Sequence, residues 1–119
     1  MQKFLLKSKI HRVRITDANL EYEGSISIDE ELMEQANILP YEKVSVWDIN
    51  NGARFETYAI PAVKHSGDII VNGAASRLVQ IGDIIIIATF GIYDEKELDG
   101  FKPVLVYVDG KNHAVDIVK

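Results

Sequence analysis

The pair Gly24-Ser25 is the first place in the sequence where side-chain chemistry needs an explanation. It opens the alternating segment SISID (25–29) and follows an aromatic residue and a carboxylate, Tyr22 and Glu23. Glycine adopts positive φ at low cost, and serine caps or bends the backbone, so most Gly-Ser pairs are simple turns. Taken alone, the pair therefore predicts a turn, and a chemical role needs support from other segments.

Residue types that usually carry out catalysis are scarce in the rest of the chain. The sequence has no cysteine, which excludes disulfides, thiolate catalysis and cysteine-liganded metals. Its histidines, His11, His65 and His113, have no partner at i, i+4 and no carboxylate at ligand spacing. A nucleophile elbow, a Walker loop and a dinucleotide-binding glycine motif are also missing. We therefore expect no metal, and a chain with these features is ordinarily a binding module.

The composition is that of one soluble globular domain. The chain has 119 residues, close to the usual domain size of about 100–150, and 47% of them are hydrophobic. The longest apolar run, residues 84–88, is far shorter than the roughly 20 residues that a membrane helix needs. The N-terminal segment lacks the apolar core and cleavage site of a signal peptide. We expect a cytoplasmic protein with no membrane partner.

The charge of the chain argues against nucleic acid as a partner. The formal net charge is −5, the wrong sign for binding that depends on neutralising phosphates. Five basic residues nevertheless precede the first acidic one, Asp17, and they are Lys3, Lys7, Lys9, Arg12 and Arg14. For all but Lys9, the ordinary explanation is a solvated edge strand protected by charge.

Hydrophobic periodicity predicts the elements that must position any site near Gly24-Ser25. Alternation within residues 4–16 predicts a strand in which one face carries Lys9, His11, Val13 and Ile15, and the opposite face Ile10, Arg12 and Arg14. Residues 26–28 predict another short strand. Asp29 is the expected N-cap of a helix of two or three turns.

The remainder of the chain predicts further strands. Asn50-Asn51-Gly52 lies between the alternating segments 43–49 and 53–60, which is a strong hairpin signal. Four more strand segments follow, at 68–75, 80–90, 103–108 and 113–118. About six to eight short strands with one clear helix predict a mainly β protein, a small β-barrel. No repeat or linker divides residues 1–119, so we expect a single domain.

Four segments together resemble the pyruvoyl-dependent aspartate 1-decarboxylases of bacterial pantothenate biosynthesis. They are KSKIHRVRIT (7–16), YEGSISID (22–29), NNGARFETYAI (50–60) and VNGAA (71–75). Each segment is weak evidence alone, but the set is specific and covers nearly the whole chain in order. The resemblance implies a six-stranded double-psi β-barrel with short helices, assembled as a homotetramer with active sites between subunits. It also implies that the protein converts L-aspartate to β-alanine and CO₂.

The resemblance further implies a cofactor made from the chain itself. In the family, Ser25 Oγ attacks the carbonyl of Gly24, and elimination from the resulting ester separates residues 1–24, the β chain, from residues 25–119, the α chain. The dehydroalanine left at position 25 hydrolyses, with loss of ammonia, to a pyruvoyl group. Its ketone forms a Schiff base with the substrate and accepts the electrons freed by loss of CO₂. Neither pyridoxal phosphate nor a metal is expected.

The family's motifs imply roles for further residues of this sequence. Tyr58 matches the proton donor, and Lys9 and Arg54 match cations around the substrate carboxylates. Thr57 matches a hydroxyl near the cleavage site. The family also has a small-residue segment whose backbone lines the pocket, and it matches Asn72, Gly73, Ala74 and Ala75 of this sequence. Residues near the site with less defined roles are His11, Tyr22 and Trp47. An ion pair with the departing carboxylate would oppose catalysis, so we expect Arg54 to bind the retained β-carboxylate.

Ordinary structural explanations stay open for several of these residues. Gly73-Ala74-Ala75 would usually be a strand end that permits close packing, and Tyr58 a cross-strand aromatic. Thr57 and Tyr58 are adjacent, so a regular strand turns them to opposite faces unless a bulge intervenes. Two other functions also stay open. The chain could be a non-catalytic binding module, or a family member that needs a partner protein to mature.

Overall fold

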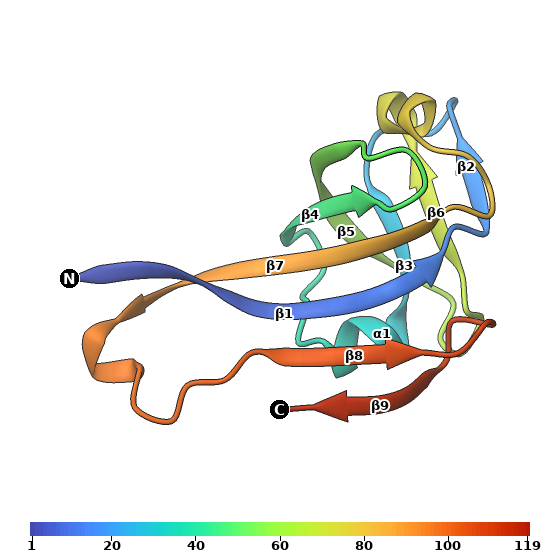
Figure 1. The fold of residues 1–119 in the computed structure, drawn as a ribbon. Helices are drawn as coiled ribbons and strands as arrows, with labels where there is room; N and C mark the ends of the chain where they lie inside the picture. The colour runs from blue at the N-terminus through green and yellow to red at the C-terminus, as the bar shows by residue number, and fades with distance from the viewer.

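The computed structural model describes all 119 residues and is mainly β, as the sequence predicts. Nine strands form one sheet in the order β2-β6-β3-β5-β4-β7-β1-β8-β9, accompanied by three short helices (Figure 1). The helices are α1 (Glu30–Gln35), η1 (Gly73–Leu78) and η2 (Glu95–Glu97). The strands are β1 (Gln2–Arg14), β2 (Asp17–Asn19), β3 (Ile26–Asp29), β4 (Lys43–Asp48), β5 (Arg54–Ala62), β6 (Ile69–Asn72), β7 (Ile84–Asp94), β8 (Val104–Val108) and β9 (Ala114–Val118).

The sheet closes into a barrel because β1 runs almost directly into β2. The connecting residues Ile15 and Thr16 donate backbone hydrogen bonds to Asp83 O at 2.9 Å and Ile69 O at 2.8 Å. Since β2 pairs with β6 while β1 pairs with β7, the β1–β2 segment completes a ring with β3 to β7. This ring is the predicted six-stranded barrel, and the parallel pairs β2–β6 and β3–β5 fit a double-psi topology. The β8–β9 hairpin is added outside it, on β1.

Aliphatic side chains fill the barrel, and a bulge in β1 brings two of them inward. Ile10 and Val13 are both fully buried, although regular alternation predicts that they lie on opposite faces. The register with β7 shifts between these two residues, and Arg12 has a φ of 68°, which together mark a β-bulge. The predicted alternation, which places Val13 on the same face as Lys9 and His11, is therefore wrong beyond the bulge. Lys9 and His11 still share one face, opposite Ile10.

Helix α1 begins where the sequence predicts but is shorter than two to three turns. Asp29 is its N-cap and accepts a hydrogen bond from Glu31 N–H at 2.9 Å. The helix ends after six residues, because Asn37 takes a φ of 56° and Ile38 N–H donates to Met33 O at 2.8 Å. No helix in the structure is long and apolar enough to cross a membrane.

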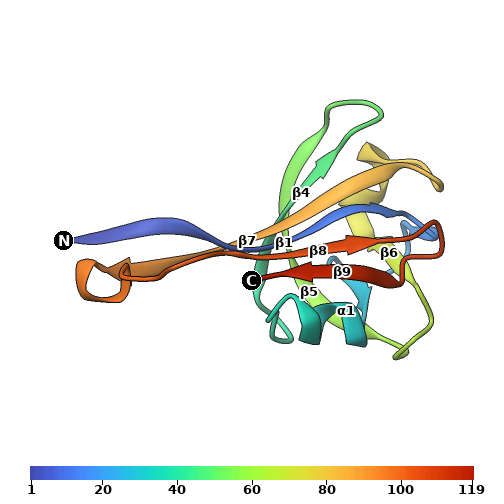
Figure 2. The same ribbon diagram turned by 60° about the horizontal axis from the view of Figure 1, so that its bottom comes forward.

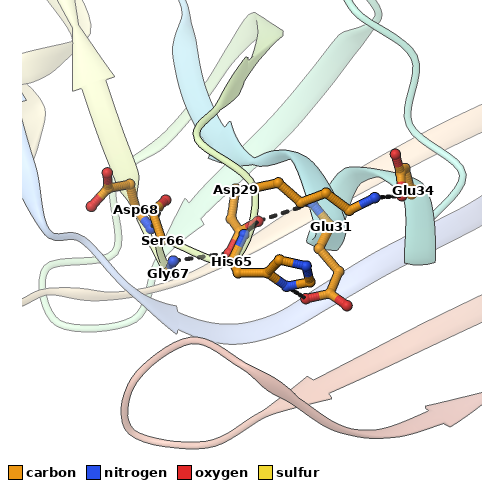
Figure 3. Close-up of polar contacts among 8 residues, drawn as sticks. Asp29, Glu31, Glu34, His65, Ser66, Gly67 and Asp68 are labelled. Carbon is orange, nitrogen blue, oxygen red and sulfur yellow. Dashed lines mark hydrogen bonds and ion pairs between the residues drawn. The ribbon is translucent and has the colours of Figure 1, made fainter.

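Asp29 also ties the end of β3 to the loop that follows β5. Its carboxylate is buried and accepts hydrogen bonds from His65 N–H at 3.0 Å and Gly67 N–H at 2.8 Å (Figure 3). On the surface of the same loop, His65 Nδ1 contacts the carboxylate of Glu31. These contacts fix one end of β3, whose other end begins next to Ser25.

A two-stranded arm projects from the barrel (Figure 1, Figure 2). It pairs the first residues of β1 with the last residues of β7, and η2 lies at its tip. The arm carries exposed apolar side chains, among them Phe4, Phe90 and Ile92. Exposed apolar surface of this kind is typical of a contact with another protein chain.

Candidate active site

Gly24-Ser25 enters β3 in a backbone conformation that a serine rarely adopts. The φ angles are 50° at Gly24 and 85° at Ser25. Only glycine takes such angles without strain, because it has no Cβ. Ser25 is also buried, with 2% of its surface exposed. The pair is thus strained, and its serine is buried while Gly24 remains exposed.

Asn72, the last residue of β6, holds the Ser25 hydroxyl. Its side-chain Nδ2 donates to Ser25 Oγ at 3.3 Å and to Ser27 Oγ at 3.1 Å, and its backbone N–H donates to Ser25 O at 2.9 Å. The antiparallel register of β3 and β6 places the two residues together, because Ile26 lies opposite Val71. An amide donor at this point both orients the hydroxyl and can stabilise negative charge that develops on an oxygen there.

Gly73 allows β6 and the Gly24 segment to approach each other closely. A Cβ atom on Gly73 would lie 2.6 Å from Gly24 N and 2.9 Å from Gly24 Cα. Real Cβ atoms do not approach backbone atoms so closely, so any other residue at position 73 would displace Gly24. The strand predicted over 68–75 is wrong beyond Asn72, because Gly73 begins the 3-10 helix η1.

Thr57 and Tyr58 face opposite sides of β5, and both lie close to the Gly24-Ser25 bond. The pairing of β5 with β4 runs through both residues without a register shift, so no bulge intervenes. Thr57 lines a hollow together with Gly24, Asn72, Ala74 and Ala75. Tyr58 lines a second hollow that includes Ser25. The two residues thus line different hollows, one that includes Gly24 and one that includes Ser25.

Three tyrosines surround the hollow that contains Ser25. They are Tyr22, Tyr41 and Tyr58. The Tyr58 hydroxyl lies 3.7 Å from the position that a Cβ on Gly24 would occupy. The family motifs predict Tyr22 and Tyr58 near the site but not Tyr41, which lies outside the four motif segments. Only the fold brings Tyr41 to Ser25, and no local pattern in the sequence could have identified it.

Arg54 and Trp47 lie together, but in a separate hollow. The two residues are cross-strand neighbours on β5 and β4, and the guanidinium carbon lies 4.5 Å from the centre of the Trp47 ring. Phe55, Glu56 and Phe90 line the same hollow, and Ser25 does not. Stacking on Trp47 orients the cation, yet one chain alone does not place it beside Ser25.

Lys9 and His11 also lie apart from the hollows around Ser25. Both are on β1, where the His11 ring packs edge-on against Tyr107 with the ring centres 5.5 Å apart. Burial, followed by the charges of Lys9 and Arg12, lowers the pKa of His11. Its Nδ1 is buried without a hydrogen-bond partner. The chain therefore brings Gly24, Ser25, Thr57, Tyr58 and the 72–75 segment together and leaves the predicted cations elsewhere.

Comparison with known proteins identifies the family of the chain. Residues 1–115 match the family model described as aspartate decarboxylase. The chain belongs to the aspartate decarboxylase family. An aspartate 1-decarboxylase of Thermoanaerobacter pseudethanolicus is 57% identical over 117 residues, which cover 98% of this chain and 100% of the relative. The family predicted from the four motif segments is thus confirmed.

Two further relatives carry the same name and match over most of their length. The aspartate 1-decarboxylase of Syntrophus aciditrophicus is 58% identical over 112 residues, 94% of this chain and 97% of the relative. That of a Sulfurihydrogenibium species is 54% identical over 115 residues, 97% of this chain and 86% of the relative. The similarity therefore includes the barrel and the segments around Ser25.

Proposed function

We propose that this chain is a cytoplasmic carboxy-lyase that converts L-aspartate to β-alanine and CO₂ in pantothenate biosynthesis. We further propose that it uses a pyruvoyl group made from its own Ser25. Membership of the aspartate decarboxylase family supports the reaction. The observation that carries the cofactor proposal is the strained Gly24-Ser25 pair, in which Ser25 is buried and its hydroxyl is held by Asn72.

Self-cleavage between Gly24 and Ser25 uses groups that the chain already holds. Ser25 Oγ attacks the carbonyl carbon of Gly24, a C–O ester bond forms, the C–N peptide bond breaks, and the proton of the hydroxyl passes to the released amine. Loss of the Cα proton of residue 25 then expels Gly24 as a free carboxylate and leaves a double bond. Addition of water and departure of ammonia complete the ketone. Strain at a positive φ, of order 1–3 kcal/mol, favours breaking this bond.

The surroundings of Ser25 fit a small group with a ketone oxygen. Asn72 Nδ2 donates to Ser25 Oγ before cleavage and would lose this partner when the oxygen leaves with Gly24, so it would be free to donate to the new ketone oxygen. Ala74 and Ala75, in the hollow beside Gly24, add little bulk. The pyruvoyl group would supply the electron-accepting carbonyl that ordinary side chains lack. Tyr58, in the same hollow as Ser25, would donate a proton to the substrate carbon that loses CO₂. A phenol keeps its proton at neutral pH and can therefore act in this way.

We also propose that the working protein is a homotetramer with active sites between subunits. L-Aspartate carries two carboxylates, yet neither Arg54 nor Lys9 lines the hollows beside Ser25 in one chain. A second copy packed against the first would supply these cations. The exposed apolar arm with Phe4 and Phe90 offers a surface for such packing.

Intact mass spectrometry under denaturing conditions tests the proposal directly. The matured protein should consist of residues 1–24 and 25–119, the larger lacking ammonia and carrying a blocked N-terminus. The Ser25→Ala variant, which has neither the nucleophile nor the leaving oxygen, should fold but stay intact and inactive. A parent chain that stays intact on prolonged warming would contradict self-processing. Cleavage only after addition of cell extract would favour a family member that needs a maturation partner.

A further inference from the structure

Tyr41 adopts a backbone conformation that a bulky residue seldom takes. Its φ is 70°, in the left-handed region that favours glycine and asparagine. Two backbone hydrogen bonds hold it there, from Tyr41 N–H to Ala59 O at 2.7 Å and from Ala59 N–H to Glu42 O at 2.9 Å. These bonds fasten the turn before β4 to β5, directly beside Tyr58.

The ring of Tyr41 lies against the ring of Tyr58. The ring centres are 6.4 Å apart and the planes are inclined at 35°, within the range of an interacting aromatic pair. Both rings line the hollow that contains Ser25. Tyr41 is 77% exposed, so burial in the core does not account for its position.

Gly24, the last residue of the segment that self-cleavage would release, also lies near the Tyr58 ring: a Cβ on Gly24 would be 3.7 Å from the Tyr58 hydroxyl. After cleavage, Gly24 becomes the carboxyl end of the short chain and has no covalent bond to residue 25. Tyr41 stays on the same chain as Tyr58 and remains fastened to β5 through Ala59. In the matured protein, Tyr41 is thus the aromatic neighbour that restricts the Tyr58 ring.

We propose that Tyr41 is a positioning residue for the proton donor. Its ring holds the Tyr58 ring so that the hydroxyl faces substrate bound at position 25. The inference rests on the proposed function, because it applies only if Tyr58 donates the proton. It assigns Tyr41 no contact with the reacting atoms, so its effect must pass through the Tyr58 hydroxyl.

Three substitutions distinguish the effect of the Tyr41 ring from the effects of its backbone conformation and its hydroxyl. Tyr41→Asn and Tyr41→Gly remove the ring and tolerate the positive φ, whereas Tyr41→Phe keeps the ring. We expect complete self-cleavage in all three by intact mass. The Asn and Gly variants should lose about 2- to 10-fold in kcat, with KM within about twofold, since an aromatic pair is worth that much in rate. Tyr41→Phe should match the parent, as should the control Leu39→Asn, another exposed residue of the same turn.

A double-variant comparison decides whether Tyr41 acts through Tyr58. In the Tyr58→Phe background, which lacks the hydroxyl, Tyr41→Asn should cause no further loss of kcat. The inference is overturned if the matured Tyr41→Asn and Tyr41→Gly variants keep the kcat of the unsubstituted protein. It is also overturned if Tyr41→Asn lowers kcat by the same factor in the Tyr58→Phe background as in the unsubstituted protein. A cleavage defect in both variants would assign Tyr41 to maturation instead. If the Tyr58→Phe variant alone keeps the kcat of the unsubstituted protein, Tyr58 is not the proton donor. If the unsubstituted chain does not cleave itself, the proposed function is wrong.

Discussion

A Cβ atom on Gly73 would stand 2.6 Å from the backbone nitrogen of Gly24. The two glycines come from segments far apart in the sequence, so the proposed cleavage site depends on a contact between the start of η1 and the residues that precede β3. Gly73 also has a φ of 68°, which disfavours any side chain. This contact places the Gly24-Ser25 bond next to Asn72, the residue that holds the Ser25 hydroxyl.

Gly73→Ala should therefore slow self-cleavage strongly. The added methyl group must push Gly24 away, which moves the carbonyl from the attacking hydroxyl, and misplacement by about 1 Å can cost about 10²-fold in rate. The cleaved fraction can be followed over time by intact mass. Gly52→Ala is the matched control, because Gly52 has a similar φ of 78° but no atom within 4 Å of its added Cβ. Equal cleavage rates in the two variants would show that the contact is unimportant.

Tyr58→Phe should separate maturation from turnover. The ring and its packing against Tyr41 are kept, so the fold and self-cleavage at Ser25 should persist. Turnover should fall by roughly 10²–10⁴-fold, the usual contribution of a positioned general acid. Steady-state β-alanine production by fully cleaved protein gives the measurement. If the matured variant releases β-alanine at nearly the parent rate, the proton comes from another source.

Arg54→Lys should weaken substrate binding. A lysine ammonium cannot reproduce the two parallel hydrogen bonds of a guanidinium to one carboxylate, and it stacks less well on Trp47. We expect KM for aspartate to rise about tenfold or more, with cleavage intact. Arg14→Lys, at an exposed position where Arg14 donates to Gly82 O, is the control. An unchanged KM would remove Arg54 from the substrate site.

Asp48 should make the barrel less stable as the pH rises. Burial, followed by the neighbouring carboxyl group of Asp83, raises the pKa of Asp48, and its Oδ2 is buried without a hydrogen-bond partner. A carboxyl whose pKa is raised on folding stabilises the folded state below its unfolded pKa and loses that contribution as pH rises through the folded pKa. The free energy of unfolding should therefore fall from mildly acidic toward neutral pH.

Asp48→Asn should flatten this pH dependence and stabilise the protein at neutral pH by about 1–3 kcal/mol. The amide is uncharged, and its oxygen can still accept from Asn50 N–H and Asn51 N–H, as the carboxylate does. Urea unfolding of the Ser25→Ala chain at several pH values, at one protein concentration, measures the effect. Asp109→Asn is a useful contrast. Hydrogen bonds from His113 and Lys111 N–H lower the pKa of Asp109, so its contribution is lost as pH falls. A parallel pH profile in Asp48→Asn would contradict the prediction.

Features set by neighbouring residues were predictable from the sequence. Asp29 caps α1, and Asn50-Asn51-Gly52 joins β4 to β5, because side-chain hydrogen bonds and turn preferences act over a few residues. The regular strand through Thr57 and Tyr58 likewise follows from local alternation. Family motifs, rather than local physics, pointed to Ser25.

Features that depend on distant contacts were not predictable. The bulge at Arg12 arises from the pairing of β1 with β7, and no residue near it signals the change of face. Tyr41 reaches Ser25 only because its turn bonds to Ala59. The positions of Lys9 and Arg54 relative to substrate stay a prediction, since they depend on how copies of the chain pack together.

The closure of the barrel by the β1–β2 segment has a consequence for reversibility. The proposed cleavage leaves residues 1–24 as a separate polypeptide. Its strands β1 and β2 still close the barrel, because they pair with β6, β7 and β8. The mature protein would then be a case of fragment complementation. After denaturation, the two fragments would have to associate by diffusion before the barrel could close, so the rate of refolding would depend on protein concentration. The uncleaved Ser25→Ala chain keeps its ends tethered, so its own barrel can close at a rate independent of concentration.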